Sequence, residues 1–298
     1  MKVGFIGIGK MGAPMCRNLV KSGLHVIVHD VSADAVKNMV GAGATGAASP
    51  KAVAGQVEVV FTCLPYPHVV EQVALGKEGI ADGIHAGLIV VDFSTCDPAI
   101  TRKVAAELAQ KGVPFLDAPV AGGVPGAETA TISVMVGGDK AAYEEVLPLL
   151  RCVGKNIWHV GASGAGSIFK IFNNLLGFCN MAAANDAFMA ISKLGLDADK
   201  FLEVISNSSG GSHALERHRR KVLPGDFTAE FTIDLAYKDL GLALKMGEEA
   251  GVPLQFAGLL KNIMMEGRAI GIGHEDLCAI MRVIEHNMKH EVRSKPKA

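Results

Sequence analysis

The sequence predicts an α/β protein whose N-terminal part is a doubly wound parallel sheet and whose C-terminal part is all helical. Up to residue 160, short apolar runs alternate with helical patterns, which indicates right-handed βαβ units. After the turn cluster GASGAG at residues 161–166, strand signals nearly vanish and one helical pattern follows another. We therefore expect two domains, residues 1–160 and 161–298, with a long interdomain helix.

Five runs rich in Val, Ile, Leu and Phe are the expected strands, because continuous apolar runs suit parallel strands that are buried on both faces. They cover residues 3–6, 25–29, 57–64, 88–93 and 114–118. Helices that end at a glycine are expected between strands, at residues 11–22, 33–40 and 98–111. The C-terminal helices are expected at residues 167–194, 198–206, 214–222, 235–250, 253–270 and 275–286, and a disordered tail at 293–298.

Size, charge and cysteine use exclude several classes of protein. A chain of 298 residues can bury a sizeable core, and its formal net charge of −1 argues against nucleic acid or an anionic membrane as a partner. The six cysteines form no CxxC pair and the ten histidines show no ligand spacing, so we predict no metal. Scattered thiols, and a strand at the start of the chain, favour a cytoplasmic location.

Apolar residues make up 49% of the chain, yet no uninterrupted apolar span of the length that a bilayer requires is present. The most apolar segment, residues 168–194, is interrupted by lysines, asparagines and an aspartate. We expect a partner subunit to cover the excess apolar surface of this helix, in a homodimer or a homotetramer.

The N-terminal segment GFIGIGKMG places Gly7, Gly9 and Gly12 in GxGxxG spacing. It follows the first expected strand and opens a helix at Met11, as in Rossmann-type dinucleotide-binding domains. The first glycine would permit a tight turn, the second would let a pyrophosphate approach the backbone, and the third would let helix and strand pack closely. We assign these glycines, with Lys10 and Met11, to cofactor binding; the alternative is a plain glycine-rich turn.

Asp30 ends the second expected strand and bears on the choice of cofactor. A carboxylate there can accept hydrogen bonds from both hydroxyls of an adenosine ribose, and it would repel a 2′-phosphate. No arginine follows in HDVSADA to neutralise that phosphate, so NAD is favoured over NADP. The alternative is that Asp30 only caps the helix that starts near Ala33.

Lys170 lies in an otherwise apolar helical stretch, on one face with Gly166 and Asn174, because the three residues are four apart. Such a lysine could simply extend to the surface. Alternatively, burial and a neighbouring nicotinamide cation would both disfavour the ammonium form. The neutral amine could then take the proton from a substrate hydroxyl as hydride leaves carbon.

Four motifs in this order, DFSTCDP, DAPVAGG, GAGSIFKIFNN and FTIDLAYKDLGLAL, resemble the β-hydroxyacid dehydrogenase family over essentially the whole chain. The resemblance implies an oxidoreductase that interconverts a small β-hydroxy acid and its semialdehyde. It also implies that Lys170 is the catalytic proton shuttle and that Asn174 orients it and the substrate. Asn174 could instead be a satisfied core amide.

The DAPVAGG segment is implied to bind the substrate carboxylate, through Ala121, Gly122 and Gly123. Family members usually carry serine at the position of Ala121. Because this chain lacks that hydroxyl, the backbone amides of the two glycines must carry more of the binding.

The resemblance implies that Leu64 and Pro65 line the cofactor ribose, that Thr95 touches its nicotinamide end, and that Lys238 reaches over it. Ser94, which with Thr95 follows a strand and so lies at the ligand-binding edge of the sheet, is assigned to the substrate. The alternatives are that Ser94 and Thr95 cap the following helix and that Lys238 is a solvated surface lysine.

The segment SSGGSHALERHRRK carries Arg217, Arg219, Arg220 and Lys221, which could clamp a second substrate carboxylate. Such a run is more often only a solvated helix face. A clamp would favour a substrate with a distal acid group, of the 2-(hydroxymethyl)glutarate type.

We therefore expect an NAD-dependent 3-hydroxy acid dehydrogenase, acting on a small carboxylate of the 3-hydroxyisobutyrate or 2-(hydroxymethyl)glutarate type in a cleft between the domains. The first alternative is an NADPH-dependent reductase of tartronate or succinic semialdehyde. The second is a non-catalytic nucleotide-binding module.

Overall fold

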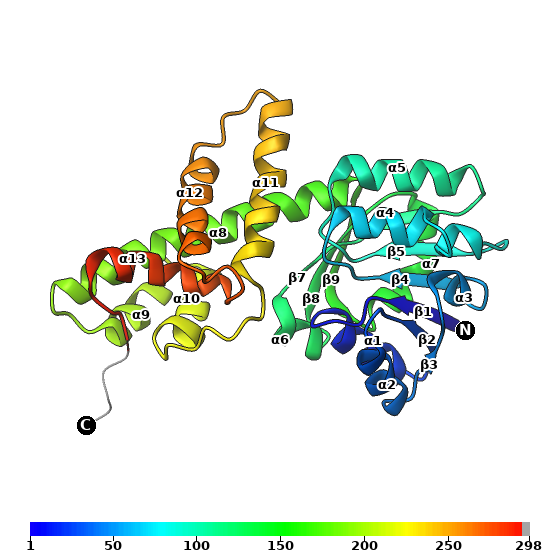
Figure 1. The fold of residues 1–298 in the computed structure, drawn as a ribbon, viewed down its shortest axis with the longest axis horizontal. Coiled ribbons are helices and arrows are strands. Elements are labelled where there is room, and N and C mark those ends of the chain that lie inside the picture. The colour runs from blue at the N-terminus through cyan, green and yellow to red at the C-terminus, as the bar shows by residue number, and fades with distance from the viewer. Residues whose placement is uncertain (294–298) are drawn as a thin grey trace. The chain divides into compact units, whose positions relative to one another are not determined.

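A computed structural model of the chain describes residues 1–293, so only Arg293 of the tail expected to be disordered lies within the described residues. The chain divides into two compact units, residues 1–170 and residues 171 onward. The 29-residue helix α8 (Ala165–Lys193) begins in the first unit and continues into the second (Figure 1). The strand that precedes it ends at Gly161, so the first turn of α8 still belongs with the sheet.

The first unit is built on a nine-stranded sheet in the order β3-β2-β1-β4-β5-β6-β8-β7, with β9 beside β8. The strands from β3 to β6 are parallel, and β8 runs antiparallel to β6 and β7. The strands are β1 (Lys2–Ile6), β2 (His25–His29), β3 (Thr45–Gly46), β4 (Val59–Thr62), β5 (Ile89–Asp92), β6 (Phe115–Asp117), β7 (Val120–Ala121), β8 (Ile132–Gly137) and β9 (Gly154–Gly161).

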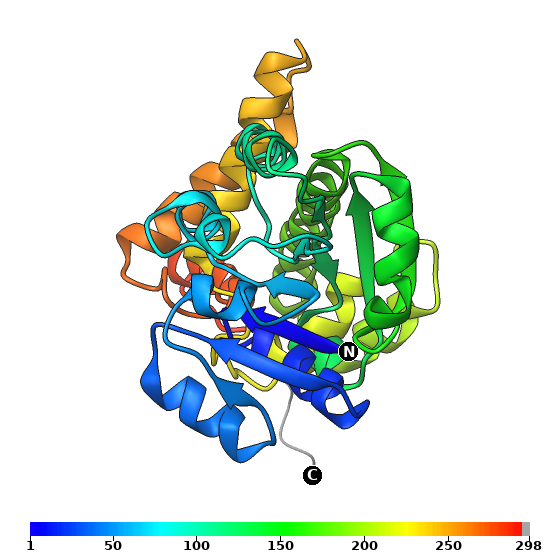
Figure 2. The same cartoon turned by 90° about the vertical axis from the view of Figure 1, so that its right-hand side faces the viewer.

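Helices cover both faces of this sheet, because successive strand residues point to opposite sides (Figure 2). On one face, Phe5 and Phe61 pack in a core with α1, α2 and α7; on the other, Val60 and Val90 pack with α3, α4 and α5. The helices of this unit are α1 (Gly12–Lys21), α2 (Ala33–Gly41), α3 (Pro50–Ala54), α4 (Pro67–Leu75), α5 (Pro98–Ala109), α6 (Gly123–Glu128) and α7 (Lys140–Leu150).

The five strands expected from the sequence are β1, β2, β4, β5 and β6, and the expected fold class is confirmed. Strand β1 lies between β2 and β4, so the chain leaves the sheet centre in opposite directions on its two sides. In open α/β sheets, ligands bind at such a switch point, beyond the carboxyl ends of the strands. We therefore expect a ligand-binding site at the segments that follow β1, β4 and β5.

The turn between β1 and α1 brings backbone into contact with backbone. Gly7 has a φ of 88°, in the left-handed region that glycine adopts readily. A Cβ on Gly12 would lie 2.0 Å from the carbonyl oxygen of Gly7, so only glycine fits at the start of α1. A Cβ on Gly9, by contrast, would meet no atom within 4 Å.

The second unit is helical. Besides most of α8, it contains α9 (Ala198–Ser206), α10 (His213–Arg217), α11 (Ile233–Glu249), α12 (Gln255–Ala269), α13 (Met281–Met288), a π-helical turn η2 (His218–Val222) and a 3-10 turn η3 (Leu277–Ile280). The expected helix over 214–222 is thus α-helical only in its first half, and the expected helix over 275–286 begins as the 3-10 turn. Phe188, Leu202, Leu240 and Met264 lie in its core.

His218 is fully buried in this core. Its ring stacks on Phe188 with centroids 4.7 Å apart, its Nε2 lies 2.8 Å from Oδ1 of Asn185, and its Nδ1 lies 3.0 Å from the carbonyl oxygen of Ala214. Burial lowers the pKa of His218 below its ordinary value, because a charged ring would lose its hydration. The folded protein therefore disfavours the charged imidazole more than the unfolded chain does.

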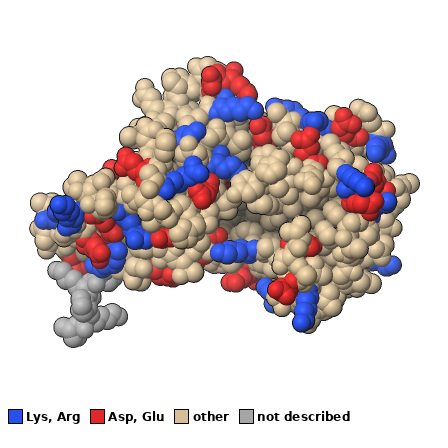
Figure 3. All heavy atoms as spheres, viewed as in Figure 1, with Lys and Arg blue, Asp and Glu red and all other residues tan. Residues whose placement is uncertain are grey.

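In the described part of the chain, no helix is both long and apolar enough to cross a bilayer. Basic and acidic side chains are interspersed on the face of the molecule drawn in Figure 3. Among the described residues, no three His, Cys, Asp or Glu side chains gather as they would around a metal ion.

The contact at Gly12 predicts a difference between two glycine substitutions. Gly12→Ala must force α1 away from the turn and should lower the free energy of unfolding by about 1–3 kcal/mol. Gly9→Ala meets open space and should change it by less than about 0.5 kcal/mol. Urea unfolding of both variants measures this, and equal destabilisation would contradict the packing described.

His218 predicts a loss of stability in acid. The unfolded chain takes up a proton on this residue near its ordinary pKa of 6.5, whereas the folded protein does so only at lower pH, so the free energy of unfolding falls as the pH drops below about 6.5. His218→Gln should lose part of the wild-type difference between pH 7.5 and pH 5.5 in urea unfolding. The control His25→Gln, at an exposed strand position, should keep that difference.

Candidate active site

The glycine turn at the end of β1 has the shape of a phosphate-binding site. The residue before α1, Met11, makes no side-chain capping bond, and the first turn of α1 carries no acidic residue. The amides at this helix end, where the helix dipole is positive, can therefore serve an anion. Gly9 and Lys10 are exposed beside it, and the space beyond Gly9 is open. The assignment of these residues to the pyrophosphate of a dinucleotide stays a prediction.

Asp30 joins the end of β2 to this turn. Its Oδ2 accepts a hydrogen bond from the amide of Ile8 at 2.8 Å, and its Oδ1 accepts one from the amide of Ser32 at 2.8 Å. Helix α2 is capped by Ser32, whose hydroxyl accepts from the amide of Ala35. The alternative that Asp30 only caps this helix is therefore wrong. The carboxylate lies half-buried next to the glycine turn, as a ribose-binding group requires.

A buried carboxylate, Asp92, links the ends of β4 and β5. Its Oδ1 accepts hydrogen bonds from the hydroxyls of Thr62 at 2.7 Å and Ser94 at 2.5 Å. The Ser94 hydroxyl oxygen in turn accepts from the amide of Leu64 at 2.8 Å. Ser94 thus orders the segment that carries Leu64 and the exposed Pro65, and its assignment to the substrate stays a prediction.

Helix α5 is capped by Asp97, which accepts from the amide of Ala99 at 2.8 Å. The alternative in which Ser94 and Thr95 cap this helix is therefore wrong. Thr95 is half-buried and directly follows Ser94 at the carboxyl edge of the sheet, so its cofactor contact stays a prediction.

The expected carboxylate-binding segment forms a short strand and the start of a helix. Ala121 ends β7 and is half-buried, and Gly122 and Gly123 are exposed at the start of α6. The segment departs from β6 through Asp117, which lies at the end of that strand. The substrate role of these three residues stays a prediction.

Lys170 and Asn174 lie one turn apart on α8. Lys170 is half-buried, and Asn174 is 8% exposed. The amide nitrogen of Asn174 donates to Oδ2 of Asp239 at 2.7 Å, and its carbonyl oxygen accepts a longer bond of 3.3 Å from Asn173. Because an ionised carboxylate only accepts, Asp239 determines which end of the amide faces it. Asn174 is thus buried and oriented, while its catalytic role stays a prediction.

Asp239 is the functional candidate that the sequence motifs did not single out. It is 1% exposed on α11, and Nζ of the neighbouring Lys238 lies 3.0 Å from its Oδ1. The Lys238 side chain is only 18% exposed, so the alternative of a solvated surface lysine is wrong. The sequence offered one signal for Asp239, its position next to Lys238 on an amphipathic helix. Its contact with Asn174 could be seen only in the folded structure.

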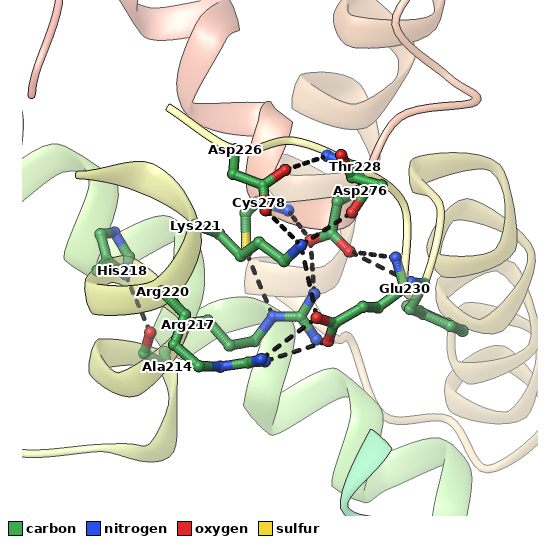
Figure 4. Close-up of polar contacts among 11 residues, drawn as sticks. Ala214, Arg217, His218, Arg220, Lys221, Asp226, Thr228, Glu230, Asp276 and Cys278 are labelled. Atoms are coloured by element: carbon green, nitrogen blue, oxygen red, sulfur yellow. Dashed lines mark hydrogen bonds and ion pairs between the residues drawn. The ribbon is translucent and has the colours of Figure 1, made fainter. Parts of the chain in front are cut away.

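The cations of the basic run, residues 217–221, form ion pairs with carboxylates of the same chain, as Figure 4 shows for Arg217, Arg220 and Lys221. Arg217 lies 2.6 Å from Asp276, Arg220 makes two bonds to Glu230, and Lys221 donates to Asp226. The side chains of Arg217 and Lys221 are 19% and 6% exposed, so for them the expectation of a solvated helix face is wrong. The same ion pairs neutralise the cations that a carboxylate clamp would use.

Arg219 and Arg220 keep the expected surface position, with 54% and 37% of their side chains exposed beside Glu216 and Glu230. Arg217 ties α10 to η3 through Asp276 and Cys278, and Asp276 also accepts from the amides of Glu230 and Cys278. Burial opposes the ionisation of Asp276, but Arg217 and these amides outweigh it and hold its pKa below the ordinary value. Arg217 and Lys221 are therefore packed into the second unit, whereas Arg219 and Arg220 lie at its surface.

Two family models match the chain in succession. The first, the NAD binding domain of 6-phosphogluconate dehydrogenase, matches residues 2–161. The second, described as NAD-binding of NADP-dependent 3-hydroxyisobutyrate dehydrogenase, matches residues 164–284. Both halves of the chain thus match proteins that bind a nicotinamide dinucleotide.

Individual proteins resemble the chain over nearly its whole length. The 2-(hydroxymethyl)glutarate dehydrogenase of Eubacterium barkeri is 42% identical over 96% of this chain and 95% of its own. The 3-sulfolactaldehyde reductase of Escherichia coli is 34% identical over 95% of both chains. Among solved structures, 3-hydroxyisobutyrate dehydrogenase from Salmonella typhimurium superimposes with a TM-score of 0.88 at 30% identity, over 95% of this chain and 99% of that one.

The resemblance expected from the four motifs is confirmed by these matches, and so are the fold and the class of reaction. The glycine turn, the adjacent carboxylate and the lysine-bearing helix all lie in segments that the two family models cover. The chain belongs to the β-hydroxyacid dehydrogenase family, and it is an oxidoreductase that acts on CH–OH donors with a nicotinamide dinucleotide.

Proposed function

We propose that the protein is an NAD-dependent dehydrogenase that interconverts a small β-hydroxy acid and its semialdehyde, with Lys170 as the proton shuttle. The observation that carries this proposal is the placement of Lys170 one helical turn before Asn174, whose amide is held by the buried Asp239. The names of the relatives support a substrate of the 2-(hydroxymethyl)glutarate or 3-hydroxyisobutyrate type.

The nicotinamide dinucleotide, held by the glycine turn and Asp30, would supply the acceptor for the hydride that leaves the substrate carbon, and the hydride donor in the reverse reaction. As that C–H bond breaks, the neutral amine of Lys170 takes the proton of the hydroxyl, and the C–O bond becomes the carbonyl of the semialdehyde. In the reverse direction Lys170 gives the proton back. Asn174, fixed by Asp239, holds the amine and the substrate oxygen in line.

The other assigned residues bind the two ligands in this proposal. Backbone amides at Gly122 and Gly123 receive the substrate carboxylate next to Ala121, with Ser94 at the neighbouring strand end. Cofactor contacts come from the glycine turn and from side chains at the sheet edge and on α11. The full cofactor set is Gly7, Gly9, Lys10, Met11, Gly12, Asp30, Leu64, Pro65, Thr95 and Lys238.

The ion pairs of the basic run bear on whether the substrate has a second carboxylate. Because Arg217, Arg220 and Lys221 are each bound to a carboxylate of the chain itself, we assign none of them to a distal acid group. A panel of β-hydroxy acids with and without a second carboxylate separates the two substrate types.

We further propose a homodimer or homotetramer in the cytoplasm. Exposed apolar side chains on α8 and α12, such as Leu176 at 66% and Phe256 at 75%, support an assembly that covers them. The six free cysteines suit a reducing compartment. The mass of the protein in solution, measured by light scattering, tests the assembly.

Lys170→Ala should reduce kcat by about 100-fold or more, because general acid–base catalysis contributes at least that factor. The affinity for NAD, measured by fluorescence titration, should stay within about twofold of the wild type, since the cofactor segments are untouched. Lys193→Ala, in the last turn of the same helix, is the matched control and should keep full turnover. Near-normal turnover in Lys170→Ala would end the proposal.

Asp30 should set the preference for coenzyme. We expect the wild type to bind NAD at least about tenfold more tightly than NADP, because the carboxylate repels the 2′-phosphate. Asp30→Ser should narrow that ratio, whereas Asp34→Ser, an exposed acidic control in α2, should leave it unchanged. A clear preference of the wild type for NADPH would favour the alternative, an NADPH-dependent reductase of tartronate or succinic semialdehyde.

A further inference from the structure

Helix α8 begins without a capping side chain of its own. The residue before it is Gly164, with a φ of 90°, and a Cβ there would lie 3.0 Å from Nη1 of Arg102. A side chain is therefore disfavoured at the position that normally supplies a cap. The first amides of a helix still need acceptors, and at a buried helix end water cannot provide them.

Asp117, at the end of β6, supplies those acceptors. Its Oδ1 accepts from the amide of Gly164 at 2.8 Å, and its Oδ2 accepts from the amide of Ser167 at 2.9 Å. The residue is 1% exposed. Burial raises the pKa of Asp117 to about 6, although the two amides act in the opposite direction. The carboxyl group is therefore largely ionised at neutral pH. A carboxylate at this helix end also meets the positive end of the helix dipole.

The same turn is held against the sheet by close packing. A Cβ on Gly166 would lie 2.3 Å from the carbonyl oxygen of Met135 and 2.6 Å from that of Asp117. The hydroxyl of Ser167 lies 3.1 Å from the hydroxyl of Thr101. These contacts determine both the position of α8 along its axis and its rotation about that axis. Lys170 follows Gly166 by four residues and so lies on the same helical face.

Asp117 also begins the DAPVAGG segment, so one residue is common to the expected carboxylate-binding segment and to the anchor of α8. We propose that Asp117 is a positioning residue: by anchoring the first turn of α8, it places Lys170 relative to the substrate-binding segment. This inference rests on the proposed function of Lys170. Asp117 itself need touch neither substrate nor cofactor.

The test replaces Asp117 by asparagine, which keeps the size and one acceptor oxygen but loses the charge and the second acceptor. We expect kcat to fall at least tenfold, with the KM for NAD within twofold of the wild type. The solvent deuterium isotope effect on kcat should rise, because proton transfer by a misplaced Lys170 becomes slower. Amide hydrogen exchange should accelerate at Gly164 and Ser167.

Asp139→Ala is the matched control. Asp139 is exposed and caps α7 through the amide of Ala142 at 2.8 Å, but that helix carries no residue of the site. This variant should lose stability while keeping kcat and the isotope effect. A second variant, Thr101→Val, removes the hydroxyl partner of Ser167 without changing side-chain size, and should show a smaller fall in kcat with the same isotope signature. It keeps the proposal testable where Asp117→Asn does not fold.

The outcomes separate the two proposals. If Lys170→Ala is inactive while Asp117→Asn exchanges its amides faster yet keeps kcat and the isotope effect, the anchor does not position Lys170 and this inference is overturned. If Asp117→Asn does not fold and Thr101→Val keeps both values, it is overturned as well. If Lys170→Ala keeps full turnover, the proposed function itself fails.

Discussion

Contact of helix backbone with strand and turn backbone, possible only at glycine, determines where the helices of the site begin. Gly12 lets α1 touch the carbonyl of Gly7, and Gly166 lets α8 touch the carbonyl of Met135. The first contact lies just beyond the end of β1 and the second lies on β8, so both helix N-termini are held at the sheet within the first unit. Gly9, beside the first contact, has open space around it, and Lys170 follows the second contact by one helical turn.

Buried carboxylates complete the arrangement. An ionised carboxylate is costly inside a protein unless hydrogen bonds or cations compensate it. Asp92, Asp117 and Asp239 each accept bonds that hold a strand end, a helix start or an amide in one orientation, and Asp276 does the same for the basic run. The charged residues of the interior thus contribute rigidity to the segments that carry chemistry.

Sequence patterns predicted the five central strands because those strands are buried on both faces and therefore uniformly apolar. They did not predict β3, β7, β8 and β9. Strands β3 and β7 have two residues each, β8 alternates buried with half-buried residues in its first four positions, and all but one residue of β9 are exposed or half-buried. For Arg217 and Lys221 the sequence pattern wrongly predicted a solvated helix face. A charge pattern along one segment cannot reveal partners, such as Asp276, that lie far away in the sequence.

By itself, the sequence determined the class of fold, the glycine turn and, through its motifs, the family, because these depend on local residue types at short spacing. Only the tertiary structure decided that Asp30 contacts the turn instead of capping α2, that Asp239 orients Asn174, and that Asp117 caps α8. Each of these is a hydrogen bond between residues 22 to 65 positions apart. Such bonds depend on how strands and helices pack, which no local pattern records.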